Sequence, residues 1–276
     1  MARARKLDSL QAYRRALKQG YGLGSGINYA PWLTVHDVPT RGTAAIIRGI
    51  KAKRDHHCLS QQEKYFFYLA EFSPSVVDIR EQFPLLPLDL MCQLAQTLRI
   101  KYPEVPCKKV PNVQSTDFLL TSQRPAGSQE TYLAVSVKTA EELDRPRVLE
   151  KLELERVWWQ LLGVPFQLFV CTEALKQQAL DIEWLTQNIR FDGTPDASQL
   201  NAACAVIDDG TYPIGALVDL IKGELSIEGK EALKILKCLV VERFVKIDWS
   251  CSIRDTQQLT VTSGGWGQIS HGAECK

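Results

Sequence analysis

The chain has 276 residues, of which 24% are charged and 8% are aromatic, and its formal net charge is +1. These values are typical of a soluble globular protein with one large or two ordinary domains. No apolar run approaches the roughly 18 residues that a membrane span needs, and no apolar signal core follows the basic first six residues, so we expect a cytoplasmic protein.

The small net charge conceals an asymmetry along the chain. Residues 1–58 contain eleven Lys and Arg against three Asp and Glu, a net charge of +8, whereas residues 173–276 contain ten against fifteen, a net charge of −5. This distribution favours a nucleic-acid-binding face near the start and a different kind of partner near the end. An ordinary solvated basic segment explains the first part equally well.

Cysteine and histidine lack the spacing of a metal site. The eight cysteines are scattered with no C-x-x-C pair, so in a reducing compartment we expect free thiols. His56, His57 and Cys58 are adjacent, and neighbours in a helix or strand point in different directions, which argues against a shared metal ion.

The first 30 residues are predicted to form a basic helix and a glycine-rich joint. Residues 6–19 have apolar positions at helical spacing, with Arg14, Arg15 and Lys18 on the polar side. The alternating glycines of residues 20–26 follow a helix instead of a strand and lack a Gly-Lys-Ser/Thr signature. They therefore indicate a flexible joint and not a phosphate-binding loop.

Residues 31–172 show the element order of an α/β domain. An extended segment over 32–42 and a basic stretch over 48–54 precede alternating helical and strand patterns. Helices are predicted at 60–72, 91–100 and 146–162, and strands at 76–83, 115–120, 132–139 and 165–171. The apolar residues of the last strand indicate that it is buried.

A predicted hairpin, residues 115–120 and 132–139, organises this domain. Asp117 lies where the first strand begins and Lys138 near the end of the second, so antiparallel pairing brings a carboxylate and an ammonium group to one edge of a sheet. Metal-assisted phosphodiester hydrolysis needs a carboxylate that holds Mg²⁺ and a lysine that orients water and phosphate. An ordinary Asp–Lys pair explains the same pattern.

Glu63 lies one turn into the helix predicted at 60–72. Ser60 and Glu63 form a capping-box pattern, in which the glutamate only satisfies the backbone N–H of Ser60. A helix glutamate at this position can also reach over a sheet edge as a metal ligand. The two roles do not exclude each other.

Residues 173–276 have a different pattern. Helices are predicted at 173–189, 197–206, 213–222 and 230–242, and strands at 244–249 and 259–261. Helices followed by a two-strand ribbon give the order of a winged helix, which usually binds DNA. Because the segment is acidic, protein binding is at least as well supported as DNA binding, and a purely structural role is a third alternative.

Several segments together resemble the TnsA family, the endonuclease subunits of heteromeric cut-and-paste DNA transposases. The matching segments are 32–42, 56–63, 76–85, 116–118, 137–138 and 149–156, of which 32–42 and 76–84 are specific. The resemblance implies a restriction-endonuclease-like α/β fold over 31–172, a mixed sheet flanked by helices. A smaller winged-helix-like domain that binds the partner proteins would follow over 173–276.

The resemblance also implies the site residues. The family's catalytic set is a helix glutamate, an aspartate at the start of a strand and a lysine on the next strand, which by position are Glu63, Asp117 and Lys138. Glu63 and Asp117 would hold one or two Mg²⁺ ions, for which Mn²⁺ would substitute, with Ser136 or the carbonyl of Val137 at the same site. This nuclease class commonly has an acid two residues before the lysine, or glutamine in this family, so Ser136 is a departure.

In this interpretation the chain is a Mg²⁺-dependent DNA endonuclease that cleaves the 5′ ends of a mobile element by phosphodiester hydrolysis. The expected partners are double-stranded DNA, a TnsB-type transposase and a TnsC-type regulatory ATPase, in the bacterial cytoplasm and at the nucleoid when active. The basic segment 41–54 would contact the DNA backbone, with Arg41, Lys53 and Arg54 as candidate contacts.

Three alternatives stay open. Ser136 is compatible with a catalytically weak or inactive nuclease-fold module that bridges transposase and ATPase. A free-standing restriction or repair nuclease of the same fold would cut DNA without partners. A Cys/His hydrolase has the least support, because His56, His57 and Cys58 are adjacent and no orienting acid is evident.

Overall fold

The structure is a computed structural model that describes residues 4–38, 44–123 and 129–262. It consists of two compact units, residues 1–176 and 177–276. None of the helices in the described ranges combines the length and hydrophobicity that crossing a lipid bilayer requires. Arg41 lies outside these ranges.

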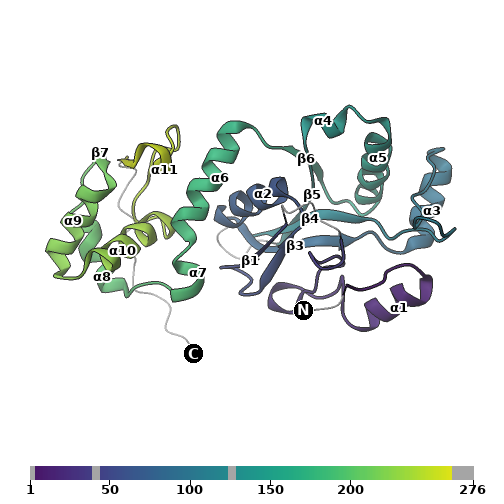
Figure 1. Cartoon of the computed structure of the whole chain (residues 1–276), viewed down its shortest axis with the longest axis horizontal. Helices are drawn as coiled ribbons and strands as arrows, with labels where there is room; N and C mark the ends of the chain where they lie inside the picture. The colour runs from purple at the N-terminus through teal and green to yellow at the C-terminus, as the bar shows by residue number, and fades with distance from the viewer. Residues whose placement is uncertain (1–3, 39–43, 124–128, 263–276) are drawn as a thin grey trace. The chain divides into compact units, whose positions relative to one another are not determined.

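A four-stranded mixed sheet forms the centre of the first unit (Figure 1). Its strands lie in the order β3 (Val76–Pro84), β4 (Ser115–Ser122), β5 (Thr131–Lys138) and β6 (Phe166–Val170). The pairs β3–β4 and β4–β5 are antiparallel, and β5–β6 is parallel. The predicted hairpin is therefore the middle of the sheet, where apolar runs in both strands are buried.

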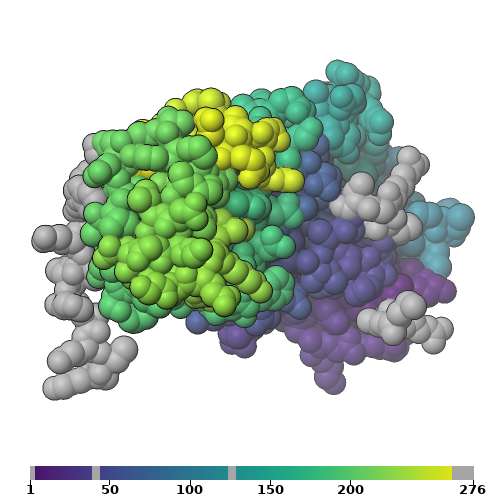
Figure 2. All heavy atoms as spheres, turned by 60° about the vertical axis from the view of Figure 1, so that its left-hand side comes forward, coloured from purple at the N-terminus to yellow at the C-terminus, as the bar shows by residue number. Residues whose placement is uncertain are grey.

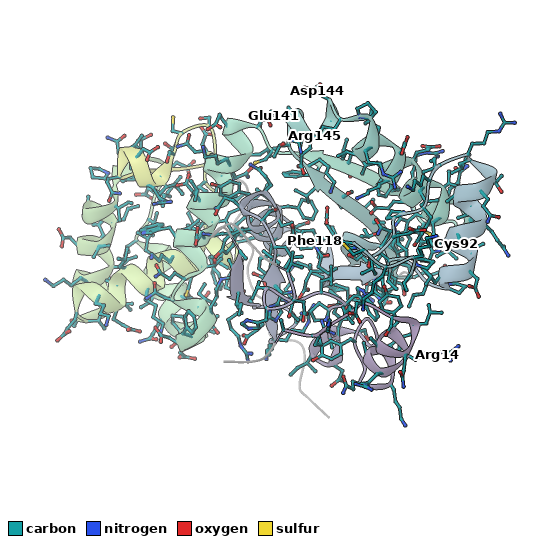
Figure 3. All side chains as sticks on the ribbon, turned by 45° about the vertical axis from the view of Figure 1, so that its right-hand side comes forward. Arg14, Cys92, Phe118, Glu141, Asp144 and Arg145 are labelled. Atoms are coloured by element: carbon teal, nitrogen blue, oxygen red, sulfur yellow. The ribbon has the colours of Figure 1, made fainter. Side chains whose placement is uncertain are left out.

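Helices cover both faces of this sheet. On one face, Phe66 of α2 (Gln61–Phe72) packs against Phe118 of β4, with 5.0 Å between the ring centroids. On the other, α3 (Leu88–Thr97) and α5 (Pro146–Leu161) share an apolar cluster with Leu119. Consecutive strand residues point to opposite faces, so β4 joins two core layers, and Figure 3 shows Phe118 within the layered interior.

The segment before the sheet contains the predicted basic helix and an additional hairpin. The helix is α1 (Leu10–Lys18), whose first turn is capped by Ser9, and the short 3₁₀ helix η1 (Gly26–Asn28) follows the joint. The hairpin β1 (Ala45–Arg48) and β2 (Asp55–Cys58) was not predicted, because charged and polar residues interrupt its apolar alternation. It leads directly into α2.

The first unit differs from the predictions in the ends of one helix, in an additional short helix and in the environment of one strand. The helix predicted at 91–100 begins at Leu88, directly after Pro87, and ends at Thr97. The short helix α4 (Ala140–Leu143) precedes α5. The last strand, β6, was predicted to be buried, but Leu168 is 37% exposed because β6 is an edge strand.

The second unit is mainly helical and carries a small sheet, and its described atoms are coloured green to yellow in Figure 2. Its elements are α6 (Glu173–Thr186, which begins in the first unit), α7 (Ile189–Asp192), α8 (Ala197–Ala205), β7 (Gly210–Pro213), α9 (Ile214–Leu225), α10 (Gly229–Val241), α11 (Ile253–Thr256) and β8 (Gln258–Val261). The helices predicted after residue 173 are present with shifted ends.

The two-strand ribbon predicted in the second unit is only partly correct. The strand predicted at 259–261 is β8, but it pairs with β7, which was not predicted. The segment 244–249 is not a regular strand, because only Ile247 forms an isolated bridge, to Val261. The winged-helix assignment therefore stays a prediction.

Candidate functional site

Asp117 is the centre of a group of polar residues at one edge of the sheet, where β4 begins and β5 ends. Its Oδ2 accepts hydrogen bonds from the Nζ of Lys138 at 2.9 Å, the backbone N–H of Val137 at 2.7 Å and the hydroxyl of Ser136 at 3.3 Å. The antiparallel pairing of β4 and β5 produces this proximity. Four of the predicted site residues are thus brought together.

Glu63 lies in the first turn of α2, and both oxygen atoms of its carboxylate accept hydrogen bonds. Its carboxylate accepts hydrogen bonds from the N–H of Leu59 and the hydroxyl of Ser60, both at 2.9 Å. Ser60 Oγ in turn accepts from the N–H of Glu63 at 3.2 Å. The backbone donor is Leu59, one residue earlier than the capping-box pattern predicts. These bonds cap the helix and fix the carboxylate in one orientation.

Gln82 of β3 connects Glu63 to Asp117. Its Nε2 lies 3.3 Å from Glu63 Oε2 and 3.5 Å from Asp117 Oδ1, and its Oε1 accepts a hydrogen bond from the Ser115 hydroxyl at 2.8 Å. Gln82 is 3% exposed and has a φ of +48°, a left-handed conformation that is uncommon for a residue other than glycine. The amide therefore spans two carboxylates from a strained backbone position.

Burial and the charges of neighbouring groups shift the pKa values of the ionisable residues at this edge. Burial raises the pKa of Glu63, and the negative charge of Asp117 raises it further. Burial opposes the charge on Lys138, but Asp117 outweighs it, so the pKa of Lys138 is raised and the side chain is an ammonium group at neutral pH. A single ammonium group does not fully compensate the carboxylates around it.

Glu155 of α5 belongs to the same edge and was not predicted. It is 8% exposed, and Thr116 and Ser136 are hydrogen-bonding partners of its carboxylate. Its Oε1 is buried without a partner among the described residues. Burial, and then the charge of Asp117, raises the pKa of Glu155 to about 8. A buried acid thus lies beside Ser136, the position at which the family resemblance expects a longer polar side chain.

The oxygen atoms here are of the kind that Mg²⁺ prefers, although they are not gathered around one point. Carboxylate and carbonyl oxygens are hard ligands suited to this ion. Within the described ranges, no group of three or more His, Cys, Asp and Glu is arranged to hold a metal ion. The unpartnered Oε1 of Glu155 and the raised pKa of Glu63 nevertheless fit a site that lacks positive charge.

The predicted DNA contacts have different environments. Lys53 is exposed, whereas Arg54 is 7% exposed and forms an ion pair with the fully buried Glu81 at 2.7 Å. The structure corrects the expectation that Arg54 lies on the surface, because the pairing with Glu81 and a bond to the carbonyl of Ile79 at 2.7 Å occupy its guanidinium.

Matches to known proteins agree with the position of this site. Residues 73–170 match the family described as "TnsA-like endonuclease N terminal", a range that includes Asp117 and Lys138. The chain is 42% identical over 185 residues to "Transposon Tn7 transposition protein TnsA" of Escherichia coli. That match covers 67% of this chain and 66% of the relative, which is slightly less than two thirds of the relative's length. The chain belongs to the TnsA family.

Proposed function

We propose that the chain is the DNA endonuclease subunit of a cut-and-paste transposase and cleaves the 5′ ends of the mobile element. The observation that carries this proposal is the linkage of Glu63 to Asp117 through Gln82, with Lys138 held 2.9 Å from Asp117. The mixed sheet flanked by helices supports a restriction-endonuclease-like fold. Membership of the TnsA family supports the endonuclease function.

Mg²⁺ is the cofactor that this donor set fits. Glu63 and Asp117 would hold it, with the carbonyl of Val137 and, more weakly, the hydroxyl of Ser136. A bound Mg²⁺ supplies Lewis-acid polarisation of the phosphate and lowers the pKa of a bound water. Mn²⁺ would substitute because it accepts the same oxygen ligands.

The residues of the chain orient the reaction. The Val137 N–H bond at 2.7 Å fixes one oxygen of Asp117, and the helix cap fixes Glu63. The Lys138 ammonium group would bind the phosphate oxygens on which negative charge builds and orient the attacking water. In-line attack on the phosphorus would leave a 5′-phosphate and a 3′-hydroxyl.

The second unit is proposed to bind the partner proteins. Its net charge of −5 over residues 173–276 disfavours the DNA backbone, and the order α8, β7, α9, α10, β8 is compatible with a winged helix. A TnsB-type transposase, which would cut and join the other strand, and a TnsC-type ATPase are the proposed partners. The assembly would act at the nucleoid in the bacterial cytoplasm.

Strand-resolved cleavage of end DNA tests this function. Wild type, Asp117→Ala and Lys138→Ala would be compared in Mg²⁺ or Mn²⁺, with and without the partner transposase. We expect wild type to cut the 5′-end strand only with the partner, and both variants to lose that cut while the partner's own cut persists. Normal cleavage by Asp117→Ala would contradict the proposed site.

Ser136 favours a second candidate, a weak or inactive nuclease module that bridges the transposase and its ATPase. A serine hydroxyl is a shorter and weaker ligand than the side chain expected there. This candidate predicts partner binding by wild type without strand cleavage in either metal ion. Cleavage by wild type that depends on Asp117 would exclude it.

A further inference from the structure

The basic segment at 48–54 uses much of its charge for internal contacts. Arg48 pairs with Asp55 at 3.4 Å, and Arg54 pairs with Glu81. The ammonium group of Lys51 donates to two backbone carbonyl groups, those of Ser73 and Val76. Arg54 and Lys51 are held by these internal contacts, so part of the charge counted in the sequence is not available to a ligand.

A second set of cations, on the loop before β4 and the first turns of α5, is differently placed. Lys101, Lys109 and Lys151 are exposed, and none of them forms an ion pair with a residue in the described ranges. Unpaired cations that cluster repel one another, so their proximity has an electrostatic cost unless an anion compensates it.

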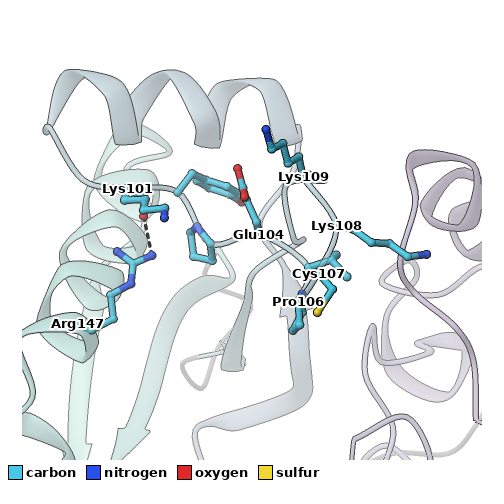
Figure 4. A pocket seen from close by; sticks show the side chains of 10 residues that line it. Lys101, Glu104, Pro106, Cys107, Lys108, Lys109 and Arg147 are labelled. Carbon is cyan, nitrogen blue, oxygen red and sulfur yellow. Dashed lines mark hydrogen bonds between the residues drawn. The ribbon is translucent and has the colours of Figure 1, made fainter.

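Part of this set surrounds a hollow of about 550 Å³ (Figure 4). Lys101, Lys108, Lys109 and Arg147 line it, and Glu104 is the single acidic residue in the lining. Arg147 reaches from α5 to the carbonyl of Lys101 at 2.6 Å, which joins the helix to the loop. The hollow is therefore a predominantly basic surface built from two elements.

Two of these cations have acidic partners, and both pairs are partly exposed. Lys108 lies 2.5 Å from Asp8, and Arg147 lies 2.5 Å from Glu150. Ion pairs exposed to solvent contribute little to stability. Exchange of the carboxylate for a phosphate oxygen would therefore cost little.

The α5 helix connects the hollow to the candidate site. Arg147, Lys151 and Glu155 follow one another at four-residue spacing, which places them along one face of the helix. Partial burial lowers the pKa of Lys151, whose side chain is otherwise exposed, and the positive charges of Arg147 and Lys138 lower it further, so both cations are within electrostatic reach of Lys151. Arg147 and Lys151 therefore form a row along α5 that starts at the hollow and ends at Glu155.

We propose that Lys101, Lys109, Arg147 and Lys151 bind successive phosphates of the DNA strand whose scissile phosphate lies at Asp117 and Lys138. This inference rests on the proposed endonuclease function and specifies the path of its substrate. The eight-residue step of α5 from Arg147 to Glu155 rises about 12 Å along the helix axis. About three to four nucleotides of one strand rise by the same distance along the axis of a DNA duplex. A row of that length fits a polyanion better than a single free phosphate ion.

The test measures the binding of a short fluorescein-labelled duplex that has the element's terminal sequence. Fluorescence anisotropy reports the binding, and the buffer contains EDTA so that no strand is cut. The test variant combines Lys101→Gln, Lys109→Gln and Lys151→Gln in the full chain. The matched control combines Lys18→Gln, Lys222→Gln and Lys230→Gln, three exposed lysines elsewhere. Melting temperatures would verify that both variants are folded.

We expect the test variant to bind about a hundredfold more weakly at about 0.1 M salt, with a salt dependence shallower by about two to three counterions. The control should change the affinity by less than about threefold. Unchanged affinity and salt dependence in the test variant would overturn the inference, as would an equal loss in the control.

The same experiment separates this inference from the proposed function. If wild type binds and, with its partner, cuts DNA while the test variant binds normally, only the phosphate path is wrong. If wild type neither binds the duplex nor cuts it, both proposals are wrong. Asp117→Asn should bind at least as tightly as wild type, because it removes only a negative charge near the phosphate.

Discussion

Two clusters of charged groups lie next to Glu81 and Gln82, which are consecutive residues of β3. The first cluster is buried and the second is partly buried, and they differ in whether positive and negative charges balance. The Glu81 cluster consists of Glu81, Arg54 and His56, and the Asp117 cluster consists of Glu63, Asp117, Glu155 and Lys138. Glu81 accepts bonds from both terminal nitrogens of Arg54 at 2.8 and 2.7 Å, and His56 Nδ1 lies 2.9 Å away. In the Asp117 cluster, three carboxylates face one ammonium group.

The pKa values express the same difference. Burial opposes the charge of Glu81, but the bonds from Arg54 and His56 outweigh it and lower the pKa of Glu81 to about 2. In the other cluster, burial and Asp117 raise the pKa values of Glu63 and Glu155. A balanced buried cluster leaves no charge uncompensated, whereas an unbalanced one is typical of a site that receives a cation.

The largest expected effect is the pH dependence of stability from Glu155. Its pKa is about 8 when folded against an ordinary value of 4.5, so the folded state binds the extra proton. The stabilisation is present below about pH 4.5 and is lost as the pH rises through about 8, by at most about 5 kcal/mol. Urea unfolding in metal-free buffer should show this decline in wild type and a smaller decline in Glu155→Gln, in which Glu63 still contributes.

A matched variant, Glu153→Gln, controls for the general loss of a carboxylate on α5. Glu153 is partly exposed and pairs with Arg156 at 2.7 Å, so its replacement should leave the pH dependence unchanged. Equal pH profiles for wild type and Glu155→Gln would contradict an unbalanced Asp117 cluster.

Removal of Glu81 from its cluster should lower the free energy of unfolding by a similar amount, because a buried positive charge would then be uncompensated. Glu81→Ala leaves the buried Arg54 guanidinium without its partner, which we expect to lower the free energy of unfolding by about 3 to 5 kcal/mol. Denaturant unfolding at neutral pH measures this loss. A change below about 1 kcal/mol would show that Glu81 is not a structural anchor.

A smaller effect is expected from Gln82→Asn. Asparagine tolerates the left-handed conformation of this residue but is one methylene too short to span Glu63 and Asp117. Single-turnover cleavage should fall about tenfold, or about 1.4 kcal/mol, with less than about 1 kcal/mol change in stability. The exposed Gln93→Asn on α3 is the control. Cleavage at the wild-type rate would show that Gln82 does not position the carboxylates.

Features that depend on residues close together in the sequence could be predicted. Strands β4 and β5 follow from local apolar patterns bounded by turn residues, and α5 follows from helical spacing after Pro146, because local preference and burial agree there. Asp117 and Lys138 could be placed together because a hairpin fixes their relation.

Contacts between distant parts of the chain could not be predicted in this way. Gln82 reaches Asp117 only through the pairing of β3 with β4, and Glu155 reaches Ser136 only through the packing of α5. Arg54 was expected at the surface because charge usually implies exposure, and its partner Glu81 is 27 residues away. Local patterns carry no information on such pairings.

The most direct test of an unbalanced, cation-binding cluster is the effect of Mg²⁺ on the melting temperature of wild type and Asp117→Asn. If the dissociation constant is near 1 mM, about 10 mM Mg²⁺ should stabilise wild type by about 1.4 kcal/mol and raise its melting temperature by a few degrees. Asp117→Asn should show no such rise, and removal of the ion with EDTA should reverse it in wild type. An unchanged melting temperature in wild type, or an equal rise in Asp117→Asn, would contradict a metal site at Asp117.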